Sequence, residues 1–237
     1  MKQRIWELDV LRGIFILGMV VVHLIYDLQT FLHIPFLADS KLYDFIADWG
    51  GVLFFLISGI CVTLGSHPLR RGLVVVGCGL VVSAVTFGMY YFDFAGKSMI
   101  IYFGVLHCLG VCMLLWPIFK KIPWPVLLPI AALLVYIGLE LEPYRFPTGL
   151  WLVPLGLRPI AFASSDYFPL LPFLGFFLVG AVLGKTLYKN KASLLPTVSD
   201  KNFLVRSFSL LGRWSLPIYM LHQPLITGVI VLLEVVL

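Results

Sequence analysis

Long, continuously apolar stretches dominate the chain and are separated by short polar segments. They cover residues 8–28, 48–66, 72–92, 99–118, 125–141, 169–188 and 214–236. As a helix, each is long enough to cross a hydrocarbon core about 30 Å thick. Transmembrane β-strands would instead alternate apolar and polar residues. The pattern therefore predicts an all-α, polytopic bundle of about seven spanning helices, forming a single transmembrane domain over residues 1–237.

The connection over residues 142–168 is apolar, yet prolines and glycines interrupt it repeatedly. Such a sequence favours a re-entrant or interfacial segment packed over the bundle, with a short eighth span as the alternative. No internal repeat is evident along the chain, which argues against transporters built from inverted repeats.

Composition supports a membrane protein and excludes a soluble domain. Apolar residues make up 60% of the chain and charged residues 12%, with a mean hydropathy of +1.00. Four cysteines fall within predicted spans, and small apolar packing explains them better than metal ligation. These are Cys61, Cys78, Cys108 and Cys112.

The net charge of +5 is unevenly distributed along the chain. The ends of the predicted spans fall into two sets, one for each side of the membrane, and these sets differ in charge. One set is basic and holds Lys2, Arg4, Arg70, Arg71, Lys120, Lys121, Lys185, Lys189, Lys191, Lys201, Arg206 and Arg213. The opposite set has four basic residues and most carboxylates: Lys41, Lys97, Arg145 and Arg158, with Asp27, Asp39, Asp44, Asp48, Asp93, Glu140, Glu142 and Asp166. By the positive-inside rule the amino terminus is cytoplasmic and the carboxyl terminus is outside. Basic residues in short loops do not suit a nucleic-acid surface.

The first apolar stretch carries ionisable residues along one helical face. Asp9, Arg12, His23 and Asp27 recur at helical spacing, so a helix would present them together. Ionisable groups inside a bilayer are costly, and they normally face a protein interior or a wet cavity. A carboxylate one turn from an imidazole fixes its tautomer and raises its basicity, as a general base requires. The alternative is a buried polar contact between helices.

Two later stretches each carry a histidine. His107 follows Gly104 in the fourth stretch, where glycines let another helix approach closely. His222 lies between Pro217 and Pro224 in the last stretch, and prolines that bend a helix free backbone carbonyls nearby. Both histidines suit a polar cavity or, alternatively, hydrogen-bonded packing.

Asp166 precedes the sixth stretch by a few residues. It suits an amino-terminal helix cap and would also overhang the outer mouth of the bundle. At the inner end, Arg12 either pairs with Asp9 or meets a phosphorylated ligand.

Five strings stand in the order found in one known family. They are Trp-Glu-Leu-Asp-Val-Leu-Arg-Gly with Met-Val-Val-Val-His, Phe-Phe-Leu-Ile-Ser-Gly-Ile, Phe-Gly-Val-Leu-His, Asp-Tyr-Phe-Pro-Leu-Leu-Pro-Phe and Gly-Arg-Trp-Ser-Leu-Pro-Ile-Tyr-Met-Leu-His-Gln-Pro. The chain resembles a bacterial, catalytic-domain-only member of the heparan-α-glucosaminide N-acetyltransferase family, within the wider membrane acyltransferase group. The matching positions are Asp9, Arg12, His23, His107, Asp166 and His222.

The resemblance implies an acetyltransferase in the bacterial inner membrane. Cytoplasmic acetyl-CoA would donate to an amine or hydroxyl of a sugar or glycan outside, with a histidine in a central role and no metal. The expected partners are the acyl-CoA donor, the sugar or glycan acceptor and the lipid bilayer. A homo-oligomer is compatible with the sequence, and no nucleic-acid partner is expected. The long extra regions of eukaryotic members are absent.

Elementary chemistry suggests a role for each matching residue. Anionic CoA belongs on the basic side, where Arg12, Arg70, Arg71 and Arg213, beside Asp9, would meet its phosphates. We expect His23 to act as the base, oriented by Asp27, with His107 or His222 as oxyanion or proton partner and Asp166 at the outer mouth.

Three other functions use similar ingredients. A proton-coupled small-molecule transporter would also carry intramembrane His and Asp residues and broken helices. A b-type haem protein would use His23, His107 or His222 as axial ligands. A structural scaffold explains the hydrophobicity, but it does not explain a histidine in each of three spans.

Overall fold

The computed structural model describes residues 5–34, 40–147, 149–196 and 202–236. Helices account for 75% of the structure, and the described residues contain no β-strand, which confirms the all-α fold class. Five helices are long and apolar enough to cross a membrane. They are α1 (Trp6–Leu32), α2 (Lys41–Leu64), α3 (Pro68–Tyr91), α5 (Trp124–Leu141) and α8 (Ser215–Val236).

Two shorter apolar helices occupy the remaining predicted spans. They are α4 (Val105–Phe119, 15 residues) and α6 (Leu170–Thr186, 17 residues). The fourth span was predicted to start at residue 99, but α4 begins only at Val105. Residue 104 is extended, with φ −91° and ψ −173°, and the backbone before it pairs with a distant segment instead. As a result, His107 lies in the first turn of α4 rather than near mid-helix.

Two connections differ from simple loops. The described part of 142–168 forms the 3₁₀ helix η2 (Leu150–Leu155), whose six residues are too few for the alternative eighth span. The connection between the predicted spans 169–188 and 214–236 contains a helix that the apolar pattern did not predict, α7 (Phe203–Arg213). Its start is capped by the Asn202 side chain, which accepts a hydrogen bond from the Leu204 N–H. A further 3₁₀ turn, η1 (Lys97–Met99), precedes α4.

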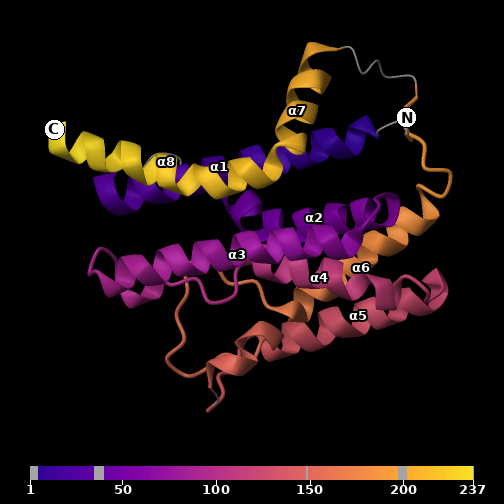
Figure 1. The fold of residues 1–237 in the computed structure, drawn as a ribbon, viewed down its shortest axis with the longest axis horizontal. Helices are drawn as coiled ribbons and strands as arrows, with labels where there is room; N and C mark the ends of the chain where they lie inside the picture. Colours follow the sequence, from indigo (N-terminus) through magenta and orange to yellow (C-terminus); the bar gives the residue numbers. More distant parts are fainter. Residues whose placement is uncertain (1–4, 35–39, 148, 197–201, 237) are drawn as a thin grey trace. The chain divides into compact units, whose positions relative to one another are not determined.

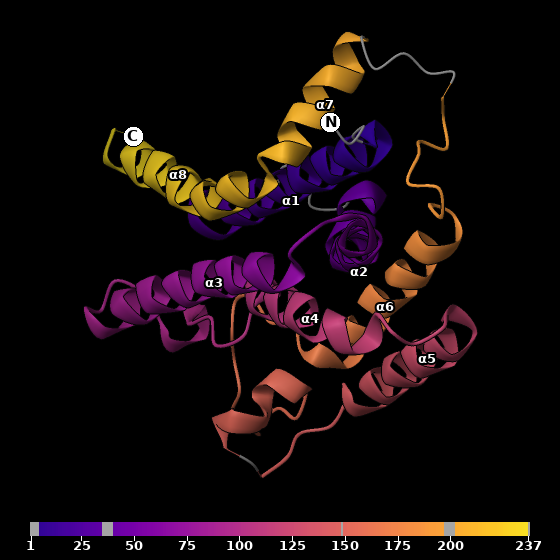
Figure 2. The ribbon, with the colours of Figure 1, turned by 45° about the vertical axis from the view of Figure 1, so that its right-hand side comes forward.

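The chain divides into two compact units. The single transmembrane domain expected from the sequence stays a prediction. The first unit comprises residues 1–54 and 190–237, and the second comprises residues 55–189, so α2 begins in one and ends in the other. In the first unit, α8 runs beside α1, and α7 crosses the amino-terminal half of α1 (Figures 1 and 2). The α1–α8 contact joins the first helix of the chain to the last one.

In the second unit the helices lie in the order α3, α4, α6 and α5 (Figure 2). The segments that precede α4 and α6 are joined to one another. Phe103 and Tyr167 form a parallel bridge, and the Ser164 hydroxyl donates to the Ile100 carbonyl oxygen at 2.9 Å. These bonds hold residues 164–168 against the start of α4. The apolar 142–168 connection is therefore anchored to the helices at its carboxyl-terminal end.

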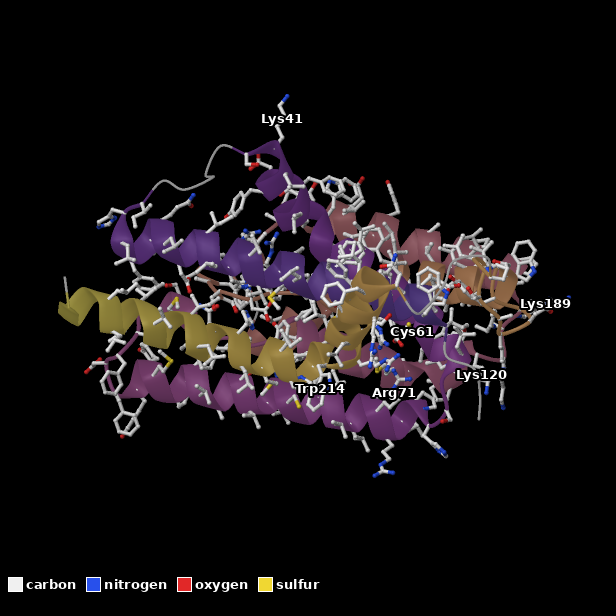
Figure 3. All side chains as sticks on the ribbon, turned by 90° about the horizontal axis from the view of Figure 1, so that it is seen from above. Lys41, Cys61, Arg71, Lys120, Lys189 and Trp214 are labelled. Atoms are coloured by element: carbon white, nitrogen blue, oxygen red, sulfur yellow. The ribbon has the colours of Figure 1, made fainter. Side chains whose placement is uncertain are left out.

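Basic residues gather at one end of the second unit. Arg71 lies at the start of α3, Lys120 just after α4 and Lys189 just after α6, and the three point to the same end (Figure 3). At this end the Lys185 ammonium donates to the carbonyl oxygens of Lys120 and Ile122, at 2.9 and 2.7 Å. This lysine therefore satisfies carbonyls that the end of α4 leaves open. Of the charged residues in the predicted asymmetry, Lys2, Arg4, Asp39 and Lys201 lie outside the described residues.

Candidate active site between helices α1 and α8

Two histidines meet where α8 packs against α1. The ring centroids of His23 and His222 are 4.9 Å apart, and the rings are nearly perpendicular at 77°. His222 is buried, with 8% of its surface exposed, and His23 is half-buried. Of the three predicted intramembrane histidines, these two belong to the first unit and lie in direct contact. They form the centre of the candidate site.

Backbone carbonyls fix the tautomers of both rings. The Nδ1 atom of His23 lies 2.9 Å from the Met19 carbonyl oxygen, and the Nδ1 atom of His222 lies 2.6 Å from the Tyr219 carbonyl oxygen. Because a carbonyl oxygen can only accept, each Nδ1 carries the hydrogen. In the neutral rings both Nε2 atoms therefore carry lone pairs. A histidine held in this way is ready to accept a proton.

Asp27 lies one turn after His23 and is almost fully buried, with 2% of its surface exposed. Its Oδ2 atom accepts a hydrogen bond of 2.7 Å from the Gln223 side-chain amide on α8. The Met19 carbonyl, rather than this carboxylate, sets the His23 tautomer. Asp27 instead joins α1 to α8 through its hydrogen bond to Gln223.

Two acceptor atoms on α8 are buried without a hydrogen-bond partner among the described residues. They are Nε2 of His222 and Oε1 of Gln223. Burying an unsatisfied polar atom costs about 1–3 kcal/mol, so native proteins rarely leave such atoms unfilled. Two neighbouring orphan acceptors in one helix contact indicate that a bound molecule or water completes their hydrogen bonds.

The predicted cofactor-binding residues of α1 form a second polar group. Asp9 pairs with Arg12 on the same helix, and its Oδ2 atom lies 3.5 Å from Nε of Arg213 at the end of α7. Nearby, Glu7 accepts a 2.8 Å hydrogen bond from the Leu194 N–H. The Arg213 side chain remains 46% exposed, so it can meet a ligand. The predicted pairing of Arg12 with Asp9 is therefore confirmed. Its predicted contact with a phosphorylated ligand stays a prediction.

Glycines bring α7 and α1 close enough for this arrangement. Gly13 packs against the Phe208 carbonyl and Gly212 against the Asp9 carbonyl, with no room for a side chain at either position. Small residues at such crossings are typical of helix contacts in membranes. The close approach holds Arg213 within reach of Asp9.

His107 has a different environment in the second unit. Its Nδ1 atom accepts the Gly104 N–H at 3.2 Å, and its Nε2 lies 3.3 Å from the Ser83 hydroxyl on α3. Ser83 in turn donates to the Ile101 carbonyl oxygen at 2.6 Å, so Nε2–H is the donor toward Ser83. Gly79 of α3 packs flat against the imidazole. Both ring nitrogens are therefore engaged in holding the start of α4.

Asp166 also serves the start of α4, although the sequence suggested a cap for the sixth helix. Its Oδ2 atom accepts the Val105 N–H at 3.2 Å, and Gly104 leaves the space that the carboxylate occupies. A negative charge is favourable there because helix amino termini are partly positive. The start of α6 follows Pro169 and has no side-chain cap.

Neighbouring Tyr167 donates from its hydroxyl to the Val153 carbonyl oxygen at 2.8 Å. Burial raises the pKa of Tyr167 to about 12, an increase that the nearby positive charges of Arg158 and Arg145 partly oppose. The phenol therefore stays neutral at physiological pH. It joins η2 to the segment that carries Asp166.

The structure divides the predicted site residues into groups. The first unit brings together His23, Asp27 and His222 at one place, and Asp9, Arg12 and Arg213 at another. The second unit holds His107 and Asp166 at the start of α4, with Arg70 and Arg71 at its basic end. No group of three potential metal-ligating His, Cys, Asp or Glu side chains occurs in the described part of the chain.

Sequence reasoning missed Gln223 and Ser83. A polar amide directly after His222 inside an apolar span was a signal for Gln223, because such groups are costly in a bilayer. Ser83 offered no comparable signal, since serines are common in membrane helices and bond locally.

Comparison with known proteins identifies the family. Residues 4–224 match the sequence model described as "Heparan-alpha-glucosaminide N-acetyltransferase, catalytic". No curated protein and no solved structure matched the chain.

Proposed function

The chain belongs to the heparan-alpha-glucosaminide N-acetyltransferase catalytic family, and on this premise we propose that it is an acetyl-CoA-dependent acetyltransferase of a bacterial inner membrane. It takes the acetyl group from cytoplasmic acetyl-CoA and transfers it to an amino sugar or sugar hydroxyl on the outer side. The observation that carries the proposal is the His23–His222 pair, whose Nε2 atoms both hold lone pairs beside buried Asp27.

For an amine acceptor, the nitrogen attacks the thioester carbonyl carbon of acetyl-CoA. The new C–N bond forms and the C–S bond breaks, with its electron pair leaving on the CoA sulfur. The amine loses one proton to an enzyme base, and the thiolate takes up a proton as free CoA. Amide and thiol are the products, and no oxidant or metal enters the balance.

His23 is the proposed base, because its Nε2 lone pair is fixed by the Met19 hydrogen bond and the ring is only half-buried. A positioned base contributes about 10²–10⁴-fold to the rate. His222 presents the same lone pair, so in its neutral form it accepts a second N–H of the amine and orients it. The negative charge of Asp27 stabilises the imidazolium that forms on His23.

Arg213 and Arg12 are the proposed ligands of the CoA phosphates. Arginine presents a planar fork of donors that suits phosphate oxygens, and the Arg213 side chain is 46% exposed. Asp9 holds the two guanidinium groups close together before CoA binds. Arg70 and Arg71, at the basic end of the second unit, add positive charge that attracts the anionic donor.

The test uses the full chain purified in detergent. We expect saturable acetyl-CoA binding by calorimetry, weakened by Arg213→Ala, and acetyl transfer to glucosamine detected by mass spectrometry. His23→Ala should lower kcat by about 10²–10⁴-fold and leave the Kd for acetyl-CoA unchanged, because the base acts only in the chemical step.

His67→Asn provides the matched control. His67 is exposed before α3 with a positive φ of 55°, a conformation that asparagine tolerates. This variant should retain full activity. If the wild-type chain bound no acyl-CoA and instead carried glucosamine across vesicle membranes in response to a proton gradient, the transporter interpretation would replace the enzyme.

A further inference from the structure

The orphan acceptors of α8 point to a second contact with the acetyl acceptor. His222 Nε2 and Gln223 Oε1 are buried and have no hydrogen-bond partner among the described residues. His222 itself is more than nine-tenths buried. Because both atoms can only accept, what they require is a molecule that carries donors.

The Gln223 side-chain amide is bonded to Asp27. Its nitrogen donates to Asp27 Oδ2 at 2.7 Å, so its oxygen is directed away from that carboxylate. The orphan oxygen is therefore a consequence of the bond to Asp27.

Both side chains face the same partner helix. His222 contacts His23, and Gln223 contacts Asp27, one turn further along α1. Consecutive Cα atoms are about 3.8 Å apart, so the two orphan atoms originate from neighbouring positions in one contact. Two orphan acceptors in one helix contact suit a small molecule that carries two donor groups.

We propose that Gln223 is a specificity-determining residue for the acceptor: its Oε1 accepts a hydrogen bond from a hydroxyl on the carbon next to the acetylated amine. His23 and His222 receive the two N–H groups of the amine, and Gln223 recognises the neighbouring hydroxyl. This inference rests on the proposed function, because it assumes that the amine binds at the histidine pair.

The experiment measures binding to the full chain in detergent by calorimetry, without acetyl-CoA. The probes are methyl glucosaminide, in which the hydroxyl at carbon 1 is blocked, and its 3-deoxy analogue, which lacks the remaining hydroxyl next to the amine. The wild-type chain should bind the parent about 5-fold more tightly, the value of one neutral hydrogen bond. Gln223→Met should bind both probes equally, because methionine fills the space without an amide.

Gln29→Met is the matched control. Gln29 also has a buried side-chain atom without a partner, but it lies two positions after Asp27, about 200° around the helix. We expect this variant to keep the wild-type preference for the parent probe. Gln223→Asn, with an amide on a shorter stem, gives a second variant should Gln223→Met fail to fold.

Separate measurements distinguish the two hypotheses. Acetyl-CoA binding is measured on the same samples and should be unchanged by Gln223→Met. Equal wild-type affinity for the two probes, or a preference that survives in Gln223→Met, would overturn the role of Gln223 and leave the acetyltransferase intact. A Gln223-dependent preference in a chain that binds no acetyl-CoA would support the subsite and overturn the proposed donor.

Discussion

At the scale of single residues, hydrogen bonds give three histidines in apolar helices different chemical capacities. His23 and His222 each donate from Nδ1 to a backbone carbonyl, which leaves Nε2 with a lone pair. His107 accepts the Gly104 N–H at Nδ1 and donates from Nε2 to Ser83. A proton added to His107 would oppose the Gly104 N–H. We therefore propose that His107 positions α4 and does not act as a base.

Substitutions at His107 test this assignment. His107→Ala removes the acceptor for the Gly104 N–H, and we expect a loss of about 1 kcal/mol in stability, the usual cost of losing a cap. His107→Asn restores an acceptor oxygen close to the same place and should recover part of that loss. Both are measured by thermal unfolding in detergent.

The activity of the same variants decides between the two roles. After correction for the folded fraction, each variant should acetylate glucosamine at close to the wild-type rate. A drop in kcat of about 10²-fold or more with an unchanged melting temperature would instead make His107 a catalytic group.

At the scale of helices, backbone contact at glycines determines which elements lie close enough to share a site. The α1–α7 crossing has a glycine on each side, Gly13 and Gly212, each against a carbonyl of the other helix. This crossing places Arg213 beside Asp9. The position of the proposed CoA-binding arginine Arg213 therefore depends on the uncharged backbone contact between α1 and α7.

Gly212→Ala tests the crossing. A Cβ at Gly212 would meet the Asp9 carbonyl, so α7 must move away from α1, at a cost typical of overpacking, about 1–3 kcal/mol. We expect a lower melting temperature and a weaker Kd for acetyl-CoA. Gly228→Ala, on α8, is the control because nothing lies within 4 Å of its Cβ position. Equal behaviour of the two variants would contradict the proposed link between this crossing and CoA binding.

Prediction from the sequence succeeded where the residues concerned lie within a single helix. The long spans follow from uninterrupted apolar runs, and the shared face of His23 and Asp27 follows from their spacing. The start of α4 was predicted too early because residues 99–104 are as apolar as the spanning helices. Their backbone instead bonds to residues 164–168. Asp166 was assigned to the wrong helix for the same reason. α7 was missed because it follows a polar, Lys-rich segment.

Contacts between residues far apart in the sequence could not be predicted from local spacing. The approach of His222 to His23, and the hydrogen bond from Gln223 to Asp27, join residues almost 200 positions apart along the chain. Their spacing in the sequence carries no information about this pairing. What the sequence did indicate was the cost of placing each polar group in a bilayer, and hence that each needs a partner.

At the scale of the whole molecule, charge determines orientation. The second unit holds Arg71, Lys120 and Lys189 at one end, where three helices begin or end (Figure 3). By the positive-inside rule we propose that this end faces the cytoplasm. In that orientation the basic residues would lie on the side where acetyl-CoA is available.

Labelling of single cysteines tests the orientation. In a chain whose native cysteines are replaced by serine, Lys189→Cys and Tyr144→Cys place thiols at opposite ends of the second unit, both at exposed positions. A thiol reagent that does not cross membranes should label residue 144 in intact spheroplasts and residue 189 only after lysis. The reverse pattern would invert the topology and remove the proposed source of the donor.

Asp9 has a consequence for ligand selection at the start of α1. Asp9 pairs with both Arg12 and Arg213, so a carboxylate already lies against each of the two guanidinium groups. An anion that binds these arginines must therefore replace their ion pairs with the Asp9 carboxylate. Chloride or another monovalent ion gains little from that exchange, whereas a pyrophosphate can engage both arginines at once. The aspartate thus reserves the two cations for polyanionic ligands.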